Sequence, residues 1–257
     1  MTDSRASDAG FPILGVPIRI HPSWLIMALF IAWSLASGAL PSLYGGLPAG
    51  AYWAMALLIV LGIAASIVLH ELAHTLVGRA MGVPVRRITL FLFGGAAELA
   101  DEPKRPVAEL TMAIAGPAFS VVFSFVLAAA AGATQTAGGP REAVVALSYL
   151  ATLNLVLAAF NMVPAFPLDG GRVLRAILWM STGDLDRATR IAARAGEILA
   201  IVLVALGVFA LFATGAAAGL WWILIGLFLY SAARGARREQ EARQVFGGRA
   251  IAEFMTP

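Results

Sequence analysis

Long apolar runs are the feature that most constrains what this chain of 257 residues can fold into. A helix needs roughly 20 apolar residues to cross a bilayer. Hydrophobic residues make up 60% of the sequence and charged residues 13%, whereas a soluble domain is about half apolar and about a quarter charged. The sequence therefore predicts an all-α polytopic membrane protein with about six transmembrane helices, at about 22–40, 51–78, 107–131, 143–163, 194–214 and 219–233.

The basic residues predict how these helices are oriented. Six spans place the amino terminus, residues 79–106, residues 164–193 and the carboxyl tail on one side. Every Lys and Arg except Arg141 belongs to this side, when Arg194 at the start of the fifth span is counted with it. Because cytoplasmic loops are enriched in Lys and Arg, both termini are predicted to be cytoplasmic and the protein to lie in the cell membrane. Topology thus accounts for the positive charge, and no nucleic-acid partner is expected. Residues 1–21 are polar and predict no removable signal peptide.

The segment between the second and third spans, residues 83–99 (VPVRRITLFLFGGAAEL), does not have a helical pattern. Pro84 is followed by β-branched and aromatic residues and then by Gly94-Gly95, which predicts a small membrane-associated β-hairpin. The alternative is an amphipathic loop. A shorter apolar piece at 170–180 is predicted to be an interfacial continuation of the fourth span.

Ionisable residues interrupt the second apolar run, in the stretch IVLHELAHTLVG (67–78). His70 and His74 are four positions apart, so a helix presents both imidazoles on one face, with Glu71 beside them. This HExxH pattern is the zinc-hydrolase signature of two ligands and a general base. The alternative is a buried, hydrogen-bonded histidine pair. Ionisable groups inside a membrane span are usually functional, which favours the metal site.

Catalytic zinc commonly takes three protein ligands, and the chain has no cysteine to supply one. Asp169 is the best candidate, in the stretch NMVPAFPLDGGR (161–172) at the same predicted depth as the histidines. Two prolines break the helix there, and Gly170-Gly171 permit a sharp backbone path. The alternative is that Asp169 caps the following helix. His21, next to Pro22, suits an entry into the first span better than a ligand.

The two motifs together resemble the site-2 protease family of intramembrane zinc metalloproteases. FLFGGAAEL and AGPAFS also look like features of that family. The resemblance implies one Zn²⁺ per chain, held by His70, His74 and Asp169. It also implies that Glu71 is the catalytic base and that Asn161 contacts the substrate or stabilises the oxyanion.

The expected activity is zinc-dependent cleavage of transmembrane protein substrates in regulated intramembrane proteolysis. Phe93, Gly94 and Gly95 belong to a hairpin whose open edge can pair with an extended substrate. Gly116 and Ser120 match a Gly-x-x-x-small pattern, for which helix packing is the favoured explanation.

The competing hypotheses are a zinc transporter or metal-sensing membrane protein using the same ligands, and a catalytically silent scaffold. Transport gives Glu71 no needed role and would call for ionisable residues in the outer halves of the spans, which nearly lack them. Residues 1–250 are therefore predicted to form an intramembrane metalloprotease domain. Residues 251–257 resemble the opening of a CBS domain, so the chain resembles the CBS-domain-bearing branch of the family, truncated before those domains. The expected partners include a second copy of the chain, in a homodimer, and a nucleotide at the missing CBS domains.

Overall fold

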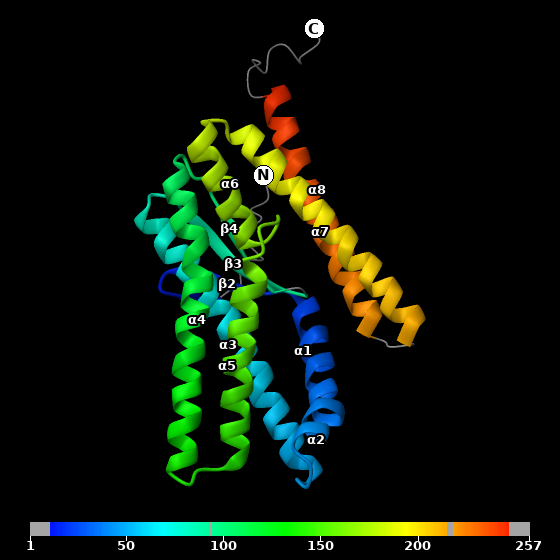
Figure 1. The fold of residues 1–257 in the computed structure, drawn as a ribbon. Coiled ribbons are helices and arrows are strands. Elements are labelled where there is room, and N and C mark those ends of the chain that lie inside the picture. Colours follow the sequence, from blue (N-terminus) through cyan, green and yellow to red (C-terminus); the bar gives the residue numbers. More distant parts are fainter. Residues whose placement is uncertain (1–10, 93, 215–217, 247–257) are drawn as a thin grey trace, which may run out of the picture. The chain divides into compact units, whose positions relative to one another are not determined.

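The computed structural model describes residues 11–92, 94–214 and 218–246 (Figure 1). The chain forms two compact units, residues 1–160 and residues 161–257. The CBS-like segment 251–257 lies outside the described residues. The helices of the first unit are α1 (Pro22–Ser34), a π-helical turn η1 (Leu35–Ala39), α2 (Leu40–Leu43), α3 (Ala49–Ala80), α4 (Pro106–Thr136) and α5 (Arg141–Asn161).

Within the described residues, six helical segments are long and apolar enough to cross a membrane. They are Pro22–Leu43, Ala49–Ala80, Pro106–Thr136, Arg141–Asn161, Leu185–Ala213 and Gly219–Arg238. The predicted multi-pass architecture is therefore confirmed. The helix that contains the predicted fifth span begins earlier, at Leu185, and its first residues are polar and include arginines.

A four-stranded sheet accompanies the helices of the first unit, in the order β1 (Phe11–Ile13), β2 (Val16–Ile20), β3 (Val85–Phe91) and β4 (Gly94–Leu99). β3 and β4 form the predicted hairpin, in which Phe91 pairs with Gly94. β2 lies parallel to β3, and β1 is antiparallel to β2. The two amino-terminal strands were not predicted, since residues 1–21 were interpreted only as a polar segment.

The sheet packs on the part of α3 that carries the histidines. Ile18 of β2 and Ile88 of β3 are fully buried, in one apolar cluster with Val68 and Leu72 of α3. Leu72 lies within the HELAH segment, and Val68 lies two residues before it. The sheet therefore supports the functional turn of α3 from one side.

The opposite end of α3 packs in a helical core. Met55 and Ile59 of α3 are fully buried, and they belong to one apolar cluster with the buried Leu150 of α5. α3 and α5 approach closely, because a Cβ added at Gly62 would overlap the Leu150 side chain. At about 1.5 Å per residue α3 is about 48 Å long, more than the roughly 30 Å of a hydrocarbon core. The helix is therefore long enough to cross the membrane and continue beyond it.

The second unit contains α6 (Asp169–Thr182), α7 (Leu185–Thr214) and α8 (Ala218–Phe246). α6 is a separate helix after a non-helical segment, so its prediction as a continuation of the fourth span is wrong. It ends at Gly183, which has a left-handed φ of 71° and closes the helix. α7 and α8 lie side by side (Figure 1), with Gly207 against the backbone of Gly219.

Candidate metal centre

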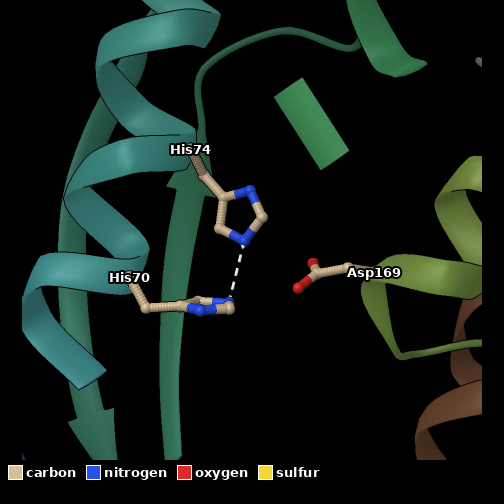
Figure 2. A group of neighbouring side chains, drawn as sticks. All are labelled: His70, His74 and Asp169. Atoms are coloured by element: carbon tan, nitrogen blue, oxygen red, sulfur yellow. Dashed lines mark hydrogen bonds between the residues drawn. The ribbon is translucent and has the colours of Figure 1, made fainter. Parts of the chain in front are cut away.

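His70 and His74 form a buried pair on α3. Their side chains are 3% and 5% exposed, and the two Nε2 atoms lie 3.1 Å apart. Figure 2 shows the two rings converging from successive turns of the helix, joined by this hydrogen bond. The four-residue spacing therefore brings the two imidazoles together as predicted.

The far nitrogens of both rings are held by α4. Nδ1 of His74 donates to the carbonyl oxygen of Met112 at 2.7 Å, since a carbonyl can only accept. Nδ1 of His70 lies 2.9 Å from the hydroxyl of Ser120, which can donate or accept. A neutral His74 thus has its lone pair on Nε2, the atom that faces His70.

The contact between the two Nε2 atoms requires a proton on one of them. With the His74 lone pair on Nε2, a neutral His70 carries its proton on Nε2 to make the 3.1 Å hydrogen bond. A metal ion bound here would take the place of that proton, because metal ligands must be deprotonated. His70 would then carry its proton on Nδ1, where the hydroxyl of Ser120 can accept it. The arrangement of nitrogens fits a metal ion that both rings bind through Nε2.

Gly116 of α4 borders the same two nitrogens. A Cβ added at this position would overlap Nε2 of His74 and would lie 2.6 Å from Nε2 of His70. The glycine therefore preserves space where the ligand atoms converge. Gly116 and Ser120 both lie where α4 packs against the histidines of α3, so their pattern serves helix packing, the favoured explanation, at the site itself.

Asp169 is the first residue of α6, in the second unit. The N-cap position belongs to Leu168, so the alternative that Asp169 is the cap residue is wrong. His70, His74 and Asp169 can each offer one ligand atom, and these atoms lie within 4.8 Å of one another (Figure 2). Two imidazoles and a carboxylate are a donor set that suits zinc and leaves a position for water.

The segment before Asp169 depends on close backbone packing. A Cβ at Gly170 would overlap the carbonyl oxygens of Met162 and Val163, and one at Gly171 would lie 2.5 Å from the backbone of Ala165 and Phe166. Neither glycine has a positive φ. The two glycines are therefore needed for the close approach of backbone segments where the chain turns into α6.

Glu71 follows His70 directly and is half-buried. A Cβ added at Gly95 of β4 would lie 2.7 Å from Cγ of Glu71, so this strand passes next to the Glu71 side chain. Gly94 has a φ of 136° at the start of β4, a conformation that favours glycine. The predicted substrate-binding residue Phe93 lies outside the described residues.

His21 and Asn154 have hydrogen-bond partners other than the histidine pair. Nδ1 of His21 accepts from the backbone N–H of Ser23, which makes His21 the N-cap of α1 and confirms its role in chain entry. Asn154 donates from Nδ2 to the hydroxyl of Ser66 at 2.9 Å, linking α5 to α3. Asn161 is the last residue of α5 and is half-buried.

Comparison with known proteins places these motifs in a family. The family model described as peptidase family M50 matches residues 58–145 and 139–205. Rip3 of Mycobacterium tuberculosis, named as a candidate zinc metalloprotease, is 42% identical over 247 residues, 95% of this chain and 62% of that protein. A Synechocystis protein with the same kind of name, sll0528, is 38% identical over 90% of this chain and 60% of its own length. The chain thus spans about three fifths of these curated relatives.

A solved structure supports the same assignment. The site-2 protease from Methanocaldococcus jannaschii is 32% identical, with a TM-score of 0.61 over 88% of this chain and 93% of that chain. The predicted resemblance to the site-2 protease family is thereby confirmed, and it extends over most of the sequence. The chain belongs to peptidase family M50, the site-2 protease family.

Proposed function

We propose that the protein is a zinc-dependent endopeptidase that cleaves transmembrane protein substrates within the membrane, in regulated intramembrane proteolysis. His70, His74 and Asp169 hold the metal, and Glu71 is the general base. One observation carries the proposal. The Nε2 atoms of two imidazoles on one membrane-length helix face each other, and the Nδ1 atom of each ring has its own hydrogen-bond partner on α4.

The chemistry divides between the ion and the chain. A zinc ion in this site would lower the pKa of a bound water toward neutrality and polarise the scissile carbonyl. Glu71 follows His70 directly on α3, so its carboxylate can take a proton from the attacking water and return it to the leaving amine. Asn161 would stabilise the developing oxyanion through its side-chain amide.

An extended substrate can bind along β4. In the order β1-β2-β3-β4, β4 is an edge strand with β3 as its one sheet neighbour among the described residues. An edge strand offers unpaired backbone groups to an added strand. Because Gly95 lies against Glu71, a substrate paired there would pass next to the proposed base.

A pair of proline variants tests strand addition. Successive residues of an antiparallel strand point their N–H groups to opposite sides, so one of Ala96→Pro and Ala97→Pro removes an outward N–H and the other a bond to β3. The outward variant should keep its fold and bind zinc but lose cleavage. Normal cleavage by both variants would rule out pairing along this edge.

The termini and the loops that carry the basic residues are proposed to be cytoplasmic, by the distribution of Lys and Arg. The absence of cysteine permits single-cysteine labelling on an unmodified background. An impermeant maleimide should label Thr136→Cys, after the third span, from outside intact cells. Ser181→Cys, at the end of α6, should be labelled only after permeabilisation. The opposite pattern would reverse the topology.

Cleavage by Glu71→Gln tests the activity itself. Wild-type protein should cleave a candidate membrane substrate, and Glu71→Gln should bind zinc with wild-type affinity but not cleave. Glu142→Gln, in the first turn of α5 and away from β4 in the sequence, is the control and should cleave normally. Zinc flux into vesicles without cleavage would instead support a transporter. A substrate trapped by Glu71→Gln would identify the physiological target, and homodimerisation and nucleotide binding stay predictions.

A further inference from the structure

The side chain of Ser120 points to a role in the metal site. We infer that Ser120 is a positioning residue, whose hydroxyl accepts the Nδ1–H of His70 and so directs Nε2 of that ring toward the ion. The inference rests on the metal site of the proposed function, but it does not depend on proteolysis. Partners of this kind fix the orientation and tautomer of ligating histidines.

The hydrogen bond of Ser120 differs from those of two threonines on the same helix, α4. A hydroxyl inside a helix commonly bonds the carbonyl four residues earlier. Thr111 and Thr134 of α4 do so, with Val107 and Ala130 as acceptors. The hydroxyl of Ser120 instead lies 2.9 Å from Nδ1 of His70, and the serine is completely buried. Its position is thus explained by the histidine rather than by its own helix.

The two histidines depend on chemically different partners. His74 is fixed by a main-chain carbonyl, that of Met112, which no side-chain substitution removes. His70 is fixed by a side chain. Without the hydroxyl, the hydrogen bond at Nδ1 no longer opposes a rotation of the His70 ring that exchanges its nitrogen and carbon positions. A substitution of Ser120 can therefore delete the partner of His70, whereas no substitution of Met112 deletes the partner of His74.

Gly116, on the same face of α4 as Ser120, also contacts the histidine pair. Gly116 lies one turn before Ser120, and any Cβ there would meet the Nε2 atoms of both histidines. Alanine normally stabilises a helix relative to glycine. A loss of zinc binding in Gly116→Ala could therefore not be attributed to a weaker helix.

Zinc affinity of the purified whole chain in detergent, measured by competition with a chromophoric chelator, tests the inference. Ser120→Ala should bind zinc about 10- to 100-fold more weakly than wild type. Ser120→Thr keeps a hydroxyl and should restore most of the affinity. Ser124→Ala is the matched control, because this buried hydroxyl one turn later bonds the Ala151 carbonyl and not a histidine. It should bind zinc as wild type does.

Several outcomes would overturn the inference. One is wild-type zinc affinity in Ser120→Ala, and another is an equal loss in Ser120→Ala and Ser124→Ala. If Ser120→Ala does not fold, the isosteric pair Ser120→Thr and Ser120→Val decides: tighter binding by the threonine variant supports the role, and equal binding overturns it. Failure of the wild-type chain to bind zinc would overturn the proposed metal site as well. Zinc binding without cleavage would count only against the proposed activity.

Discussion

The two parts of the candidate metal centre are built in different ways. The histidine part lies on one regular helix, where the spacing of His70 and His74 sets the distance between the rings, and α4 holds both Nδ1 atoms. The aspartate part is one carboxylate at the start of α6, after the non-helical residues 162–168. The histidine part is therefore specified by helical periodicity, and the aspartate part by the packing of a broken segment.

Close backbone contacts replace helical regularity in the aspartate part. The N–H of Phe166 bonds the carbonyl of Ala192 on α7, and the guanidinium of Arg175 lies over the Phe166 ring, 5.2 Å from its centroid. A Cβ at Gly196 would overlap the carbonyl oxygen of Phe166. The segment is thus fixed from α6 and α7, and small residues are needed where its backbone approaches them.

Removal of a ligand from either part should have the largest effect. His70→Ala and Asp169→Ala should each abolish cleavage and lower zinc affinity by more than the about 100-fold that an outer partner contributes. Chelator competition and a cleavage assay on the same preparations measure both effects. Wild-type zinc affinity in Asp169→Ala would remove this residue from the ligand set and leave the histidine part as the whole site.

A difference between the two ligand histidines sharpens this comparison. His74→Ala also deletes the hydrogen bond to the Met112 carbonyl, which should lower the stability of the metal-free chain by about 0.5–1.5 kcal/mol. Thermal unfolding in detergent without metal measures this change. Unaltered stability would mean that the bond to α4 contributes nothing before metal binds.

Helical periodicity explains what the sequence could predict. The spans, the shared face of His70 and His74 and the β3–β4 hairpin follow from local patterns of 3.6 or 2 residues. Strands β1 and β2 could not be found in this way, because β2 pairs with β3 across about 70 residues of chain and both strands are short. The hydrogen bond between Ser120 and His70 likewise joins two helices, through residues 50 positions apart in the sequence. Its signal in the sequence was the Gly-x-x-x-small pattern of Gly116 and Ser120, which does not reveal the histidine as the partner.

The glycines of the aspartate part should give the next largest effect. Gly170→Ala and Gly171→Ala each place a Cβ against backbone atoms, which cannot move aside as a side chain can. Overpacking of this kind costs about 1–3 kcal/mol, and the displaced segment should weaken zinc binding through Asp169. Unfolding in detergent and chelator competition measure the two losses.

Gly235→Ala is the control for the glycine variants. Gly235 lies in α8 of the same unit, and a Cβ there would meet no atom within 4 Å. It should leave zinc affinity unchanged and stabilise the helix by up to about 1 kcal/mol. Wild-type zinc binding and cleavage by Gly171→Ala would show that the segment tolerates another path, and the contrast between the two parts would fail.

The smallest effect is expected from Ser66→Ala, one turn before His70 on α3. Its hydroxyl accepts the Nδ2–H of Asn154, while Nδ2 also donates to the Leu150 carbonyl. Hydrogen bonds between membrane helices contribute about 0.6 kcal/mol on average, so stability in detergent should fall by about that amount. Zinc affinity should not change, because α3 and α4 set the histidines without α5. A loss as large as that expected for Ser120→Ala would mean that α5 also positions the histidines, and that the helix alone does not specify this part of the site.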